Sequence, residues 1–281
     1  MNANLLASRP DPEPSGAADL GYWLNASPAI LTCAVPLFGV LYLEWSGVIV
    51  ILLFWVENTL GTVFTAARIL LHRRLTHTRG HSRRGQLDNQ KVRNPGTLLR
   101  DYLYSSAFSI VFQGLFIALF ALFAVFVLVD QHPDWPDERI FSLPQLEQGA
   151  VSLALTMALG FALDAWTLRR RRFLWLKVYV LQKHERWLTL FFSLLLGFFV
   201  MIPTQSPLAV AYFLIALNTV TVVYQLRVLR KLETLPLATW LTQQVEVRNR
   251  RAGTKAITPA QQREIDTQLR HAQEDEQVAT A

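Results

Sequence analysis

Long runs of apolar residues, separated by short polar segments, fill the chain from residue 29 to residue 231. A helix that crosses the hydrocarbon core of a membrane needs about 20 mostly apolar residues. By this measure the following stretches are predicted to be membrane spans: 29–43, 47–71, 106–129, 149–168, 187–202 and 207–228. The pattern predicts an all-α, polytopic transmembrane helix bundle between a polar N-terminal tail (1–28) and a C-terminal tail (232–281).

The first and fifth of these spans are short, which leaves the number of crossings open. In the alternative topology residues 29–43 form an interfacial helix, and five spans cross the membrane. The stretch Phe173–Leu181 is apolar except for Lys177 and lies between Arg172 and Lys183. Such a pattern is typical of a further interfacial helix. In the C-terminal tail, Thr258 followed by proline and, three residues later, Gln261 predicts a capped helix to about residue 276.

The placement of charge predicts the orientation of the bundle. The chain has 27 Lys and Arg against 21 Asp and Glu, a net charge of +6. The basic residues gather in 72–105, 169–186 and 227–255, which lie on one side of the predicted membrane. Because short basic loops stay cytoplasmic, we expect the C-terminus inside a bacterial cytoplasmic membrane, and the N-terminus too if the first span crosses. Anionic lipid headgroups are the expected partners of these loops, and no nucleic acid is expected.

Several chemistries lack the residues that they need. The single cysteine, Cys33, excludes a disulfide framework. No histidine falls within a predicted span, so paired axial ligands for a membrane haem are absent. His72, His77 and His81 lie close together, but the surrounding arginines disfavour a metal ion. No phosphate loop and no hydrolase motif is present. We therefore expect no cofactor, no metal and no catalytic residue, and favour a protein that is not an enzyme.

The second predicted span carries the most informative polar residues. Glu57 lies near its middle, where a charge costs a few kcal/mol and burial favours the neutral acid. On a helix that turns about 100° per residue, Arg68 lies about 20° from Glu57, Asn58 about 100° and Thr62 about 140°. The polar residues of this span therefore share one face, which we expect to point into the bundle.

Polar residues of other spans are candidates to meet this face. Gln113 of the third span and Asn218 of the sixth lie at similar depth. The predicted intramembrane cluster comprises Glu57, Asn58, Thr62, Gln113 and Asn218. The amides also fit a simpler role as hydrogen-bonding contacts between helices.

Two further charges lie nearer the basic side of the bundle. Asp164 is expected to pair with Arg169 at the membrane surface. Arg68 is expected to extend toward the headgroups. The fourth span has two faces of small residues, which predict a central helix that packs against two neighbours.

The string FWVENTLGTVF resembles the signature of a family of uncharacterised bacterial multi-pass membrane proteins. The matching positions are Trp55, Val56, Glu57, Asn58, Gly61 and Arg68. A fainter similarity covers Phe112, Gln113 and Gly114, where the family pattern has histidine in place of Gln113. The stretch VYVLQKHERWLTLFF, which contains His184, also resembles the family's segment before a late span. The resemblance implies a polytopic bacterial membrane protein and implies no activity.

Three functions fit the sequence. The first is a small transporter or channel in which Glu57 binds a proton or cation, and it predicts a water-accessible cavity. The second is a structural or regulatory membrane protein whose polar residues join helices, and it predicts a closed, dry interior. The third is an intramembrane enzyme, for which the sequence offers only amides and hydroxyls near Glu57.

Overall fold

A computed structural model describes residues 16–81, 98–131, 141–169, 171–204, 207–251 and 257–277 of the chain. Its helices are α1 (Gly16–Tyr42), α2 (Gly47–Thr76), the 3₁₀ turn η2 (Arg79–His81), α3 (Leu98–Gln131), α5 (Leu143–Leu168), α6 (Phe173–Thr204), α7 (Pro207–Thr234), α8 (Leu237–Arg251) and α9 (Pro259–Glu276). No β-strand occurs among these described residues. The predicted all-α helical bundle is confirmed.

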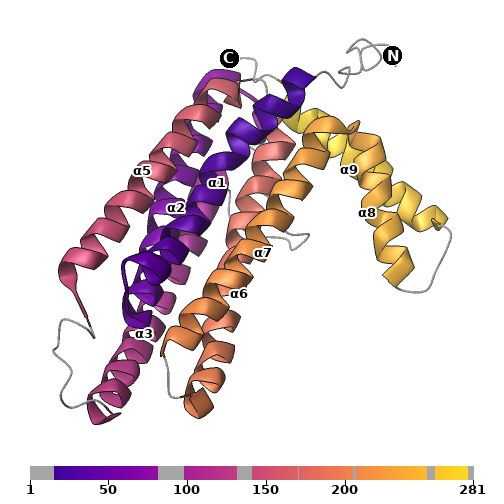
Figure 1. Ribbon diagram of the computed structural model, residues 1–281. Coiled ribbons are helices and arrows are strands. Elements are labelled where there is room, and N and C mark those ends of the chain that lie inside the picture. The colour runs from indigo at the N-terminus through magenta and orange to yellow at the C-terminus, as the bar shows by residue number, and fades with distance from the viewer. Residues whose placement is uncertain are drawn as a thin grey trace, which may run out of the picture.

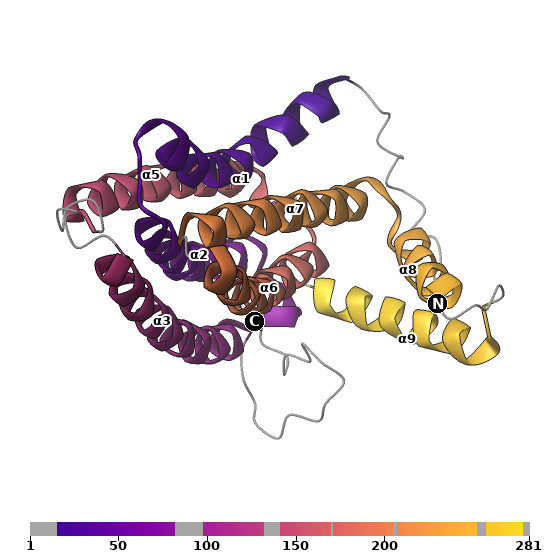
Figure 2. The same cartoon turned by 60° about the horizontal axis from the view of Figure 1, so that its bottom comes forward.

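The six long helices form an elongated bundle with α2 at its centre (Figure 1). Seen closer to the bundle axis, α1, α3, α5, α6 and α7 surround α2 (Figure 2). The most extensive contact joins α6 to α7, while α2 packs against α3, α5 and α7. At the upper end of the bundle in Figure 1, α2 and α7 end and α6 begins. We call this end, which carries Arg73, Arg74, Arg172 and Lys231, the basic end.

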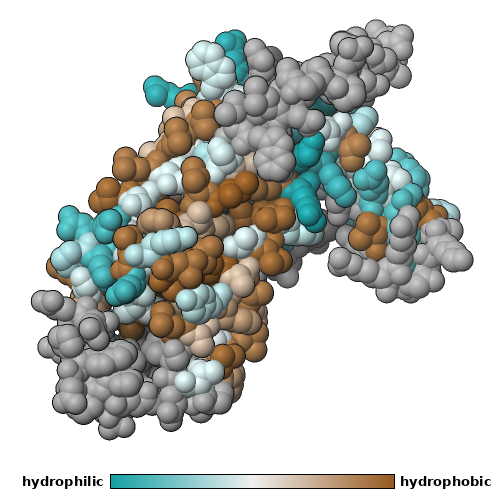
Figure 3. All heavy atoms as spheres, viewed as in Figure 1, coloured by the Kyte–Doolittle hydropathy of each residue, from teal (hydrophilic) through white to brown (hydrophobic). Residues whose placement is uncertain are grey.

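The surface of the bundle is apolar enough for a membrane. Brown, hydrophobic residues cover its flank in Figure 3, and polar residues gather where α7 gives way to α8 and α9. In the described part of the chain, four helices have the length and composition to cross a membrane: α2, α5, Leu98–Phe120 of α3 and Leu208–Thr234 of α7. The apolar part of α1, Ala26–Tyr42, is shorter. These helices identify a membrane protein, while the six crossings stay a prediction.

Several helices extend beyond the predicted boundaries. Helix α1 begins at Gly16, within the predicted tail, and α2 continues to Thr76, so that His72 lies within it. The interfacial helix predicted over Phe173–Leu181 is wrong, because this segment is the first part of the continuous helix α6. Its Leu176 and Val180 are buried against other helices. Residues that resemble a surface segment are therefore part of the bundle.

Helix α5 packs against two neighbours but is not central. Its Gly160 faces Pro28 of α1, where an added Cβ would lie 2.9 Å from the proline Cβ. Its Gly149 faces Leu53 of α2 in the same way. Leu155 and Leu159 on its other side are exposed. The predicted central position of this span is wrong, because α2 takes it.

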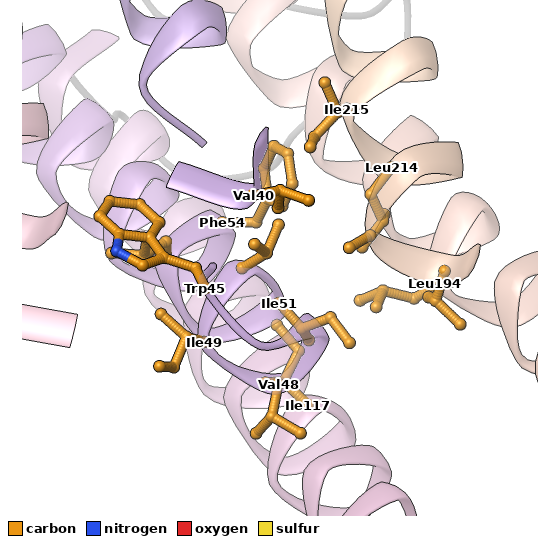
Figure 4. Packing of buried hydrophobic residues seen from close by; sticks show 14 of the residues in the cluster. Val40, Trp45, Val48, Ile49, Ile51, Phe54, Ile117, Leu194, Leu214 and Ile215 are labelled. Atoms are coloured by element: carbon orange, nitrogen blue, oxygen red, sulfur yellow. The ribbon is translucent and has the colours of Figure 1, made fainter. Parts of the chain in front are cut away.

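The turn between α1 and α2 anchors the main hydrophobic core (Figure 4). Trp45 packs there with Val40, Ile49 and other residues from α2, α3, α6 and α7. The carbonyl of Gly39 accepts hydrogen bonds from the backbone amides of Leu43 and Trp45, at 3.1 and 3.0 Å. A Cβ at residue 39 would overlap the indole ring of Trp45. Glycine is required here because the ring lies directly on the α1 backbone.

Beyond the bundle, α8 and α9 pack against each other through Leu241, Val245 and Ile265. The predicted cap of α9 is present. The Thr258 hydroxyl accepts from the Gln261 amide at 3.3 Å, and the Gln261 side chain accepts from the Thr258 amide at 2.9 Å. Helix α9 also contacts η2 and α6, which attaches this hairpin to the basic end.

Replacing Gly39 by alanine should lower the stability of the bundle. Accommodating the methyl group requires Trp45 to move out of a packed core, which costs about 1–3 kcal/mol. The matched control is Gly61→Ala, whose Cβ would meet only Met157 Cε at 3.4 Å. Alanine is favoured over glycine within a helix, so this control should melt at or above the wild-type temperature. Equal melting temperatures for the two variants in nanodiscs would contradict the packing described here.

Candidate functional site

A cavity of about 130 Å³ lies between α1, α2, α5, α6 and α7. It holds roughly ten times the space that one water molecule needs. Among the described residues, the charged side chains that line it are Glu57, Arg68, Asp164, Arg171, Lys183, Arg186, Arg230 and Glu233. Five cations thus face three carboxylates within an otherwise apolar bundle.

An ion pair between Glu57 and Arg186 closes the inner end of the cavity. Arg186 Nη2 donates to Glu57 Oε1, and both side chains are almost fully buried. Arg186 also donates to Asn218 Oδ1 through Nε at 2.9 Å and through Nη2 at 2.7 Å. The Asn218 amide points to Cys33 Sγ at 3.8 Å. One guanidinium therefore binds α6 to both α2 and α7.

A second ionic network lines the cavity nearer the basic end. Asp164 of α5 accepts from Arg68 of α2 at 2.8 Å and from Arg171 at 2.7 Å, one on each carboxylate oxygen. Arg171 Nε also lies 3.2 Å from Glu233 Oε1 of α7. The Arg171 guanidinium stacks 3.9 Å from the Trp175 ring. Hydrogen bonds to carboxylates combined with stacking on an aromatic ring are typical of arginine in partly buried sites.

Asn58 belongs to a separate contact, between α2 and α3. Its side-chain amide donates to Gln113 Oε1 at 2.8 Å. One turn of helix away from Gln113, the carbonyl of Ile110 accepts from Trp55 Nε1 at 3.1 Å. A smaller cavity of about 30 Å³ lies beside this contact. Glu57, Gly61, Lys183 and Arg186 line both cavities, so these four residues form the wall between them.

The structure divides the predicted polar cluster in two. Glu57 and Asn218 meet through Arg186, whereas Asn58 and Gln113 bind each other. Thr62 donates to the Asn58 carbonyl of its own helix at 3.0 Å and lines the smaller cavity. The two peripheral charges also differ from their expected roles. Arg68 is buried instead of extended, and it binds Asp164, for which Arg169 was the expected partner.

The sequence reasoning missed Arg186 and Lys183, which it assigned to a basic loop. Both lie on the continuous helix α6, and Arg186 immediately precedes the predicted start of the fifth span at residue 187. That span was too short for a membrane crossing. Extending it toward the N-terminus by one or two turns would have brought a cation to the depth of Glu57. A lone buried carboxylate requires such a partner, which is the signal that could have found Arg186.

The clustered histidines at the basic end form a hydrogen-bonded pair. His72 Nδ1 lies 2.8 Å from His81 Nε2, and His72 Nε2 lies 3.2 Å from the carbonyl of Arg171. His81 packs edge-on against Phe173. His77 is exposed and stands apart. No group of three metal-ligand side chains occurs within the described ranges.

The ranges that carry these contacts also carry the family match. A model described as "Family of unknown function (DUF6498)" matches residues 17–251. The chain belongs to DUF6498. The predicted membership of an uncharacterised family is thereby confirmed. The DUF6498 match runs from α1 to the end of α8 and leaves α9 outside. No curated protein and no solved structure matches the chain.

Removing either partner of the Glu57–Arg186 pair should strongly destabilise the protein. Arg186→Met leaves a carboxylate and the Asn218 oxygen without a donor, at a cost of about 3–5 kcal/mol. Glu57→Gln leaves the guanidinium without its counter-ion. The double variant should lose less than the sum of the two singles, by about 1 kcal/mol or more. Unfolding free energies in detergent test this cycle, with Lys177→Met of α6 as the control. Additive losses would contradict the described pair.

The histidine pair should make the basic end sensitive to acid. Burial, together with the neighbouring His72 and Arg73, lowers the pKa of His81 from 6.5 to about 4. The unfolded chain therefore binds this proton first, and stability falls as the pH drops from about 6.5 toward 4. The loss between pH 7 and pH 5 is on the order of 2 kcal/mol.

Melting temperatures at the two pH values measure this loss. His81→Gln should show a smaller drop than the wild type, whereas His77→Gln, at an exposed position, should drop as the wild type does. An equal drop in all three proteins would exclude His81 as the titrating group.

Proposed function

We propose that the chain is a small transporter or channel of the bacterial cytoplasmic membrane, with several spans and with the basic end toward the cytoplasm. The observation that carries this proposal is the charged cavity, which extends from the basic end to Glu57 inside an apolar bundle. Basic residues near span ends stay cytoplasmic, which supports the orientation and a cytoplasmic C-terminus. Exposed Arg73, Arg74 and Arg172 fit contacts with anionic headgroups.

Within this proposal the ligand of Glu57 is a proton and not a metal cation. A metal cation would have to displace Arg186, which already binds the carboxylate. A proton needs no such space. Protonation removes the charge that holds Arg186, and Arg186 is part of the wall between the two cavities. In this proposal, proton uptake at Glu57 weakens that wall, which couples protonation to the path of a solute.

A structural or regulatory role is the alternative, and specific contacts favour it. The Asn58–Gln113 bond and the Arg68–Asp164 pair each join two helices without any ligand. Those contacts account for the packing of α3 and α5 against α2. They leave the cavity of about 130 Å³ unexplained, because protein interiors are close-packed and hold few voids larger than a water molecule.

The two readings differ in whether water reaches the cavity. Thr32 of α1 lines it, and Thr32→Cys in a Cys33→Ser background introduces one thiol there. A charged, membrane-impermeant thiosulfonate reagent should label this thiol in nanodiscs, because the cavity admits water. Labelling is followed by mass spectrometry of the intact protein.

Val50→Cys in the same background is the matched control. Val50 is fully buried in the main core, so its thiol should stay unlabelled until the protein is denatured. If the thiol at residue 32 is protected as completely as the one at residue 50, the interior is closed, and the structural alternative replaces the transporter.

A further inference from the structure

We propose that the cavity binds a small organic anion that carries a hydroxyl group, and that Lys183 holds its negative charge. The inference rests on the proposed function, because the ligand must reach the cavity from water or from the lipid. It names the class of solute that the transporter hypothesis leaves open.

Lys183 differs from three of the four arginines that line the cavity. Arg68 and Arg171 bind Asp164, and Arg186 binds Glu57. Lys183 has no hydrogen bond or ion pair within the described ranges, and its ammonium lies 5.5 Å from the centre of the Tyr179 ring. It lines both cavities. A cation inside the bundle that has no ion-pair partner is costly unless a counter-ion accompanies it, which a bound anion would supply.

The total charge of the cavity also favours an anion over a cation. Five basic side chains line the cavity against three carboxylates. Both oxygens of Asp164 already accept from arginine, so this carboxylate is occupied. Glu57 is occupied by Arg186. A cationic solute would therefore meet an excess of positive charge, whereas an anionic one completes the balance at Lys183.

Gln182 indicates a hydrogen-bond donor on the same ligand. This side chain is 6% exposed and lines the cavity, and its Oε1 has no hydrogen-bond partner among the described residues. Buried acceptors are nearly always paired. The backbone of this turn is fixed, because Gln225 Nε2 of α7 donates to the Gln182 carbonyl at 2.8 Å. A ligand hydroxyl near Lys183 would supply the missing donor.

A phosphate that carries a glycerol group has this chemistry and comes from two sources. It is a soluble solute as glycerol 3-phosphate, and it is the headgroup of phosphatidylglycerol. The probe is glycerol 3-phosphate added to the full chain in phosphatidylcholine nanodiscs. A parallel sample in phosphatidylglycerol nanodiscs presents the headgroup instead. Melting temperature and the rate of thiol labelling at Thr32→Cys are the two readouts.

We expect glycerol 3-phosphate to raise the melting temperature in phosphatidylcholine and to slow labelling at residue 32, if the source is soluble. If the source is lipid, phosphatidylglycerol nanodiscs alone should give both effects. In either case Lys183→Met should weaken the affinity for the anion about tenfold or more, because it removes the positive charge that binds it. Lys183→Arg should retain most of it. Lys177→Met, on α6 but outside the cavity lining, should bind as the wild type does.

Two results overturn the inference. The first is the absence of both effects with the phosphate and with the anionic lipid. The second is an equal effect in Lys183→Met, or in Lys183→Gln should the methionine variant not fold. If residue 32 is labelled but neither anion changes the labelling rate or the melting temperature, only the anion proposal fails and the transporter proposal stands. If residue 32 is never labelled, both proposals fail together.

Discussion

The ion pair between Glu57 and Arg186 is the constraint on which the rest of the bundle depends. Each charge alone would be costly in an apolar interior, so neither helix can hold its residue without the other. The pair therefore fixes the depth at which α6 lies against α2. Asn218 accepts two further hydrogen bonds from the same guanidinium and fixes α7 to this level. The three helices share one register, set by a single polar contact.

One turn of α2 distributes polar contacts to different neighbours. Trp55 and Asn58 bind α3, while Glu57 between them binds α6. Successive residues of a helix point about 100° apart, so these three side chains face different directions. Only a helix with neighbours on several sides can pair all of them. The central position of α2 therefore accounts for the concentration of polar side chains in this turn. The main apolar core adjoins this turn on its N-terminal side, around Trp45.

Apolar length and helical periodicity were enough to predict the all-α bundle and the inward polar face of α2. The cap at Thr258 was likewise readable, because it depends on residues three positions apart. The residues that pair with that polar face could not be predicted from the sequence. Whether Arg186 or Gln113 is the partner of Glu57 depends on how α6 is rotated and how far it extends. A hydropathy pattern does not show this, because it ends the predicted span at the first charged residue. Trp45 illustrates the same limit. It resembles an interfacial tryptophan in sequence, but the glycine at residue 39 admits it to the core.

Arg171 takes part in two separate sets of contacts. Its guanidinium belongs to the ionic network of the cavity, and its backbone carbonyl faces His72 in the histidine pair at η2. Helix α9, outside the family-matched region, rests on η2. Arg171 thus links the lining of the cavity to η2, against which α9 of the C-terminal hairpin packs. A substitution that disturbs the packing of α9 on η2 would therefore reach, through His72 and Arg171, a side chain that lines the cavity.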